Sequence, residues 1–143
     1  MRKIAFIGIV IMIFLNSCTT SKSSKNGDAE KQFVTKFLTY MDHETGPKRE
    51  EMMSCISPSY INDQGIDVHK MKVNNYSIWG FSIDYFVADK GLVVVKVWGQ
   101  NKSWTHQLEF KVVKEKGKLY LMPSSHNDDY IEPWYSKKTF IKE

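Results

Sequence analysis

The feature that most constrains the fold is an alternation of apolar and polar side chains that begins near residue 76 and continues to residue 123. Successive side chains of a β-strand point to opposite faces, so this period of two predicts strands with one buried face. Turn-forming residues interrupt the alternation at 88–91, 99–102 and 116–117. We therefore expect an antiparallel meander of four strands, over 76–87, 92–98, 104–114 and 118–123.

The first of these strands is expected to bury its odd-numbered side chains. Gly80 and Gly99 are expected where the sheet bends or carries a bulge. The side chains predicted to face the core are Trp79, Phe81, Ile83, Tyr85 and Val87.

Residues before the alternation favour helices. Apolar side chains recur at helical spacing between residues 33 and 41, and Asp28 stands where an N-cap is expected. Gly-Pro at 46–47 breaks the chain before a second short helix over 48–56. Pro58 is tolerated at the first position of a third helix. The sequence thus predicts an α+β fold, with helices packed on a curved four-stranded sheet.

The amino terminus has the pattern of a secretory signal. Arg2 and Lys3 precede an unbroken apolar run over residues 4–15. A helix of this length rises about 18 Å, less than the roughly 20 residues needed to cross a hydrocarbon core. We therefore expect residues 1–17 to be removed as a signal peptide.

The residues Leu15-Asn16-Ser17-Cys18 resemble the lipobox of bacterial lipoproteins. The resemblance implies that the thiol of Cys18 receives diacylglycerol and that cleavage leaves Cys18 as the first, acylated (palmitate-bearing) residue. Two or three acyl chains on one residue hold a protein to membrane lipid more firmly than one. The alternative is an ordinary signal peptide with a chance cysteine.

Residues 18–28 are expected to form a lipidated flexible tether, because they are small and polar. Residues 29–143 are expected to form a single domain. Thr19 is not the aspartate of an inner-membrane retention signal, and no acidic cluster follows Cys18. For a Gram-negative source the resemblance therefore implies the outer membrane, with the protein facing the periplasm.

Charge excludes one class of partner. The chain has 20 basic and 16 acidic residues, and losing Arg2 and Lys3 leaves a net charge of +2. No cluster of basic residues interleaved with aromatic ones is present, so a nucleic-acid surface is not expected.

The order of helices followed by a meander resembles NTF2-like and cystatin-like α+β domains, over residues 29–122. In NTF2-like folds the resemblance implies a cone-shaped cavity between helices and sheet, which some members use for catalysis. Fold alone does not decide between binding and catalysis.

His106 is the candidate for acid/base chemistry, because it alternates in phase with the apolar residues of its strand. Asp84 is the candidate partner, although it is out of phase with the buried face of its own strand. The alternative is a neutral, hydrogen-bonded histidine at a sheet end.

His126, Asp128 and Asp129 are candidate metal ligands, since they bring one imidazole and two carboxylates together in the sequence. Their spacing matches no known metal loop, and a polar turn is the alternative. No cofactor is expected.

Trp134 and Tyr135 are candidate binding residues that either pack over the open end of the sheet or form an exposed aromatic patch. Cys55 is expected to be a small core residue without a disulfide partner. The chain is therefore expected to be a non-enzymatic envelope module that binds a small ligand or an envelope protein. The alternative function is an NTF2-like enzyme that uses His106.

Overall fold

The computed structural model describes residues 26–75 and 77–140. Cys18, the expected signal peptide and most of the expected tether lie outside the described residues. Within these residues no helix is long and apolar enough to span a bilayer. The helices are α1 (Asp28–Thr39), α2 (Arg49–Ser54) and α3 (Pro58–Asp63), with a single 3-10 turn η1 (Gln100–Lys102).

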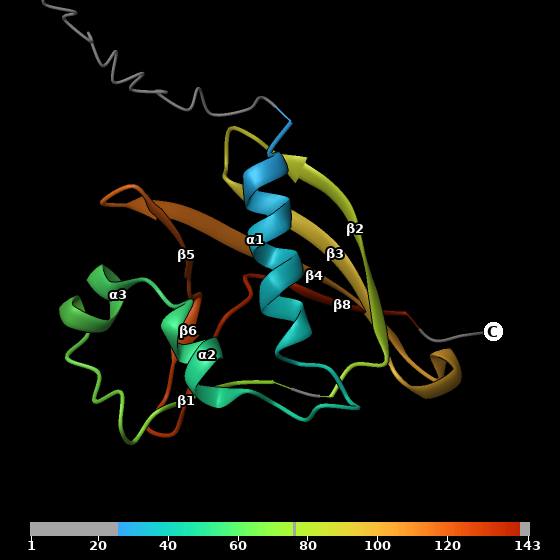
Figure 1. Cartoon of the computed structure of the whole chain (residues 1–143), viewed down its shortest axis with the longest axis horizontal. Coiled ribbons are helices and arrows are strands. Elements are labelled where there is room, and N and C mark those ends of the chain that lie inside the picture. The colour runs from blue at the N-terminus through green and yellow to red at the C-terminus, as the bar shows by residue number, and fades with distance from the viewer. Residues whose placement is uncertain (1–25, 76, 141–143) are drawn as a thin grey trace, which may run out of the picture.

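The predicted meander is confirmed. Its strands are β2 (Gly80–Val87), β3 (Leu92–Trp98), β4 (Thr105–Glu115) and β5 (Lys118–Met122), each antiparallel to the next (Figure 1). The fold is α+β, as the switch from helical spacing to alternation predicts.

Four further strands were not predicted. β8 (Lys137–Phe140) pairs with the beginning of β4, along the same edge that β5 occupies further on. β1 (Lys72–Val73), β6 (Ser125–His126) and β7 (Tyr130–Glu132) form a second small sheet, in which β1 is parallel to β7. These strands have two to four residues, too few for a period of two to be recognised.

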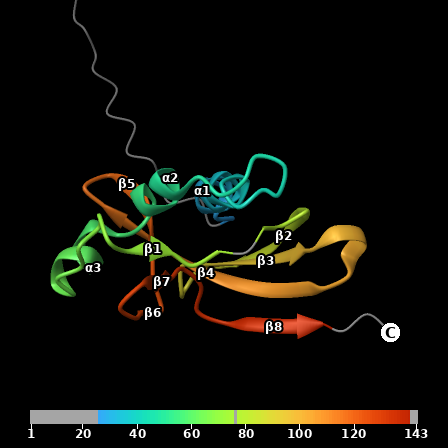
Figure 2. The same cartoon turned by 90° about the horizontal axis from the view of Figure 1, so that it is seen from below.

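The helix α1 packs across one face of the meander, and the core lies between them (Figure 2). The rings of Phe37 and Phe110 meet edge to face, with centroids 5.6 Å apart. No residue of α1 lines the pockets at α2 and α3. The buried core includes Val34 and Leu38 from α1, Met41 just after it, and Val93, Val95, Val97 and Leu108 from the sheet.

The predicted buried face of β2 is wrong in part. The register of β2 against β3 shifts between Ile83 and Tyr85, which leaves Asp84 as the extra residue of a bulge. The shift exchanges the faces beyond this point, so Tyr85 is exposed and Phe86 packs against the core. Trp79 is also exposed and stacks on His43, with ring centroids 4.1 Å apart.

The two glycines that were predicted at bends or bulges lie directly against indole rings. Neither Gly80 nor Gly99 has a positive φ. A Cβ on Gly80 would lie 2.6 Å from the ring of Trp98, and a Cβ on Gly99 would lie 2.2 Å from the ring of Trp104. Glycine is required at these positions because the indole rings lie against the backbone.

The N-cap of α1 is Gly27, so the expected N-cap at Asp28 is wrong by one residue. The backbone of Gly27 is in the left-handed region, with φ of 64°, and the ring of Phe86 occupies the space that a Cβ would need. A residue with a Cβ fits neither condition. Asp28 instead lies in the first turn, where its negative charge interacts favourably with the helix dipole.

We predict that Gly27→Ala destabilises the fold by about 2 to 5 kcal/mol, because left-handed strain adds to the displacement of Phe86. Gly117→Ala is the matched control, since Gly117 has φ of 82° but no atom within 4 Å of the added Cβ. The control should lose about 1 to 2 kcal/mol. Urea unfolding measures both, and equal losses would contradict the packing of Phe86 on Gly27.

Candidate functional site

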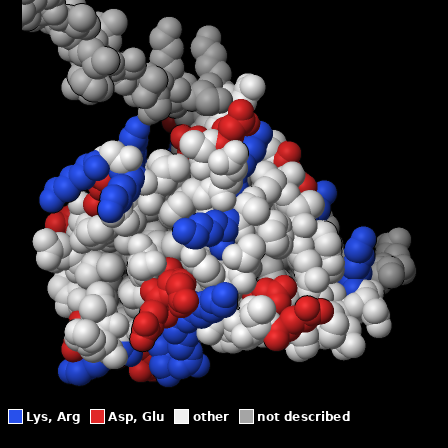
Figure 3. All heavy atoms as spheres, in the orientation of Figure 1, with Lys and Arg blue, Asp and Glu red and all other residues white. Residues whose placement is uncertain are grey.

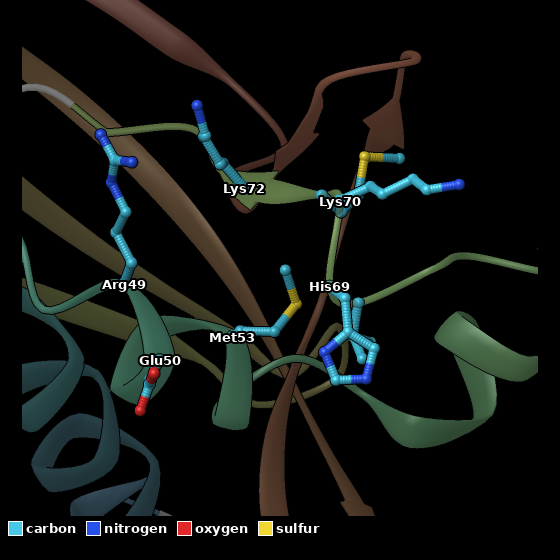
Figure 4. A pocket seen from close by; sticks show the side chains of 8 residues that line it. Arg49, Glu50, Met53, His69, Lys70 and Lys72 are labelled. Atoms are coloured by element: carbon cyan, nitrogen blue, oxygen red, sulfur yellow. The ribbon is translucent and has the colours of Figure 1, made fainter.

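A pocket of about 460 Å³ lies between α2 and the chain that leads into β1 (Figure 4). This volume is within the range of small-molecule sites. Apolar and cationic side chains both face the space. The lining residues are Arg49, Glu50, Met53, Val68, His69, Lys70, Met71 and Lys72.

α2 contributes both to the core and to the pocket. Residues three or four apart lie on the same face of a helix, so Arg49 and Met53 are neighbours on its surface. Met52 is buried in the core, whereas Arg49 and Met53 line the pocket. The same short helix is therefore held to the core and presents a cation beside an apolar side chain.

A tight turn at Asp67 shapes the opposite wall. The side chain of Asp67 accepts a hydrogen bond from the backbone N–H of His69 at 3.0 Å. The backbone carbonyl of Asp67 accepts from the N–H groups of Lys70 and Met71, each at 3.1 Å. The hydrogen bond from His69 is the main reason that the pKa of Asp67 lies below its ordinary value. Asp67 is therefore ionised at neutral pH.

The wall is tied to the second sheet at its far end. Lys72 donates its backbone N–H to the carbonyl of Asp129 at 3.0 Å, and Val73 is buried beside Ile131. The backbone of Lys72 is thus paired with the second sheet, while its side chain is exposed and lines the pocket.

The charged side chains that line the pocket are not equally placed to bind a ligand. Lys70 forms an ion pair with Asp67, with 3.5 Å between Nζ and Oδ2. In Figure 4 Lys70 extends away from the pocket and Glu50 turns away from Met53, whereas Arg49 and Lys72 extend to the same side. Figure 3 shows basic and acidic side chains side by side over α2 and β1. Arg49 and Lys72 are therefore the cations that an anion in this pocket would meet.

A hydrogen-bond network from the end of β4 holds the beginning of α3. Ser57 is fully buried and caps α3 by accepting from the N–H of Tyr60 at 3.1 Å. Its hydroxyl donates to the carboxylate of Glu115, which also accepts from the backbone N–H and the hydroxyl of Ser59. The hydrogen bond from Ser57 is the main cause that lowers the pKa of Glu115. A carboxylate at the beginning of α3 thus links this helix to the β4–β5 hairpin.

His106 lies on the predicted face of β4, at the end of the sheet. Its ring stacks on Trp104, with centroids 4.9 Å apart and an angle of 27° between the planes. Burial, and after it the charge of Lys137, lowers the pKa of His106. The imidazole is therefore neutral at neutral pH and packed against an indole.

The acid/base pair of His106 and Asp84 does not form. Asp84 is paired with Lys96 at 3.4 Å, and Lys96 lies opposite Gln107 in the register of β3 and β4. Neighbouring residues of a strand point to opposite faces, so Asp84 and His106 lie on different faces of the sheet.

The two aromatic candidates have separate environments. Trp134 is 5% exposed and packs edge to face on Phe110, so it cannot present its ring to a ligand. Tyr135 is exposed, and the ammonium of Lys111 lies 5.6 Å from the centre of its ring. Packing over the sheet is therefore the correct alternative for Trp134.

The metal candidates belong to a polar turn between β6 and β7. The side chain of Asn127 accepts from the N–H groups of Asp129 and Tyr130, which closes the turn. Nδ1 of His126 is 2.9 Å from the hydroxyl of Tyr60. Among the described residues no three histidine, cysteine, aspartate or glutamate side chains are arranged to hold a metal ion, so His126, Asp128 and Asp129 form no such group.

Cys55 is buried, as expected, and burial raises the pKa of its thiol. It therefore stays protonated at neutral pH. This environment does not suit a nucleophile.

Sequence reasoning missed the pocket. Arg49, Val68 and Lys72 have no shared spacing or motif. The tertiary fold brings them together, with β1 packed near α2 and paired with β7, 58 residues further along the chain. The sequence offers one weak signal, the apolar Val68 between the polar residues Asp67 and His69, and the structure leaves this side chain 39% exposed.

Comparisons with protein-family models, curated proteins and solved structures give no match to this chain.

We predict that Glu115→Gln lowers the free energy of unfolding at pH 7 by about 1 to 2 kcal/mol, because charge-assisted hydrogen bonds to Ser57 and Ser59 are lost. A lowered pKa stabilises the fold above the ordinary pKa of the carboxyl, and this contribution is lost as pH falls through the lowered value. The difference between the variant and the parent should therefore disappear in acid.

Urea unfolding at several pH values measures this difference. Asp63→Asn is the control, because it removes an exposed carboxylate from α3, the helix that Glu115 holds, and it should alter stability by less than about 0.5 kcal/mol. A loss for Glu115→Gln that is constant with pH would contradict the role assigned to the carboxylate.

Proposed function

We propose that the chain is a lipid-anchored, non-enzymatic module of the bacterial cell envelope that binds a small anionic ligand with an apolar part. The single observation that supports the ligand is the pocket at α2, where Arg49 and Lys72 lie beside Met53 and Val68. Guanidinium and ammonium groups favour carboxylate and phosphate oxygens, and the apolar wall favours a ligand that is not a bare ion.

The lipobox residues Leu15 to Cys18 support the anchor. The chain enters the domain at Gly27, beside the end of β2, while the pocket lies against α2, which follows the other end of α1 (Figure 1). A tether of about ten residues spans roughly 16 to 19 Å. An anchor at Cys18 would therefore leave the pocket open to the aqueous side, which in a Gram-negative envelope would be the periplasm.

We propose that the fold is of the cystatin-like kind within the NTF2-like and cystatin-like group. One long helix, α1, packs directly across the meander of β2 to β5, which supports this choice. Phe37 of α1 meets Phe110 of β4 edge to face in this layer, and the pocket at α2 lies outside it.

We predict that Cys18→Ala abolishes both incorporation of labelled fatty acid and retention of the protein in the membrane fraction, because the thiol is the proposed acyl acceptor. Cys55→Ala is the matched control and should keep both properties, since that thiol is buried. Labelling that persists in Cys18→Ala would exclude Cys18 as the acceptor.

We predict that 1-naphthyl phosphate binds the chain from residue 18 on, carrying Cys18→Ala, and that 2-naphthol binds more weakly because it lacks the anion. Arg49→Glu combined with Lys72→Glu should weaken binding of the phosphate at least about tenfold, since two charge-assisted interactions are replaced by repulsion. Fluorescence titration measures both ligands.

Lys90→Glu combined with Lys118→Glu is the control. It makes the same change of charge at exposed positions of the strand hairpins, outside the lining of the pocket. Equal weakening in both double variants would show that net charge, rather than the pocket, attracts the ligand, and the proposal would be wrong.

A further inference from the structure

The pocket at α2 adjoins a second hollow of different character. This hollow has a volume of about 550 Å³ and lies between α2, α3 and β5. Met53 and Val68 line both spaces, so the two share a boundary. The side chains that line the second hollow and not the first include Ile56, Pro58, Ile61 and Tyr120, and none of the residues lining the second hollow is charged.

The two spaces together form a groove with a cationic end and an apolar end. Of these two spaces, Arg49 and Lys72 line the first, and Ile61 and Tyr120 line the second. Tyr120 also borders a further hollow, which is lined by Glu115 and Lys116. An isolated anion would leave the apolar end in contact with water. An uncharged apolar molecule would leave both cations without a counter-charge. A ligand that covers both ends has to carry an anionic group at one end of an apolar chain.

The boundary between the spaces suits a flexible chain. Met53 is an unbranched, half-buried thioether, and such side chains adapt to the shape of a neighbour. Val68 is 39% exposed and stands at the junction, where a chain passing between the two spaces would cover it. Both residues are apolar, so the path from one space to the other offers no polar barrier.

We infer that the groove binds a single-chain anionic amphiphile, that is, an acyl or alkyl chain with a phosphate or carboxylate head group. The head group lies at Arg49 and Lys72, and the chain passes Met53 and Val68 to lie along Ile61 and Tyr120. This inference rests on the proposed function, because it takes the anion site of the first pocket as given.

The test is a series of alkyl phosphates on the chain from residue 18 on, carrying Cys18→Ala. Butyl, octyl and dodecyl phosphate are titrated below their micelle-forming concentrations, with inorganic phosphate as the bare anion and dodecanoate as the carboxylate. Each buried methylene strengthens binding, so dodecyl phosphate is expected to bind at least about tenfold more tightly than butyl phosphate. The ratio of dodecyl phosphate to dodecanoate identifies the preferred head group.

The variant Asn62→Trp tests where the alkyl chain of the ligand lies. Asn62 is exposed on α3 and lines the apolar hollow, so an indole there fills the hollow without disturbing the core. Asp63→Trp is the matched control, because it adds the same ring at an exposed position of the same helix outside the lining. The gain with chain length should be lost in Asn62→Trp and kept in Asp63→Trp, while both variants still bind butyl phosphate.

The possible results distinguish failure of this inference from failure of the proposed function. Equal binding of butyl and dodecyl phosphate would overturn the amphiphile and leave the anion pocket in place. A chain-length gain that survives Asn62→Trp would overturn the assignment of the chain to this hollow. Failure of every phosphate to bind would overturn both proposals.

Discussion

The contacts of Phe110 at the centre of β4 support the rest of the molecule. Its ring meets Phe37 of α1 at 5.6 Å and Trp134 of the C-terminal segment at 6.4 Å, both edge to face. Near this residue the outer edge of β4 passes from pairing with β8 to pairing with β5. One side chain thus holds together the helix, the sheet and the returning chain, and the pocket elements attach at the margins of this core.

The meander was predictable because its information is local. Alternation and turn residues place β2 to β5 within a few residues of their observed bounds. Prediction failed at the bulge of Asp84, since one extra residue exchanges the faces of Tyr85 and Phe86 without any change in composition. It failed again for β1 and β7, whose parallel pairing joins distant short segments, such as Lys72 and Tyr130.

In the candidate site, too, residues close in the sequence were recognised and residues distant in the sequence were missed. His126, Asp128 and Asp129 are close in the sequence, which is why they were predicted as metal ligands. In the structure Asn127 closes a turn between them, and among the described residues they form no group that could hold a metal ion. Arg49 and Lys72 are 23 residues apart and carry no pattern, yet they line one pocket. A binding site assembled from exposed residues of short elements leaves little trace in the sequence, because its members follow no common period.

The walls of the pocket are short elements, each held to the core at a few points. α2 is held by Met52, the segment after it by Ile56, α3 by the buried Ser57, and β1 by Val73. Met52, Ile56 and Val73 belong to the same buried cluster as Phe37 and Phe110. The walls of the pocket are therefore joined to the core formed by α1 and the sheet, and the exposed side chains between these points, such as Arg49 and Lys72, are the ones left to contact a ligand.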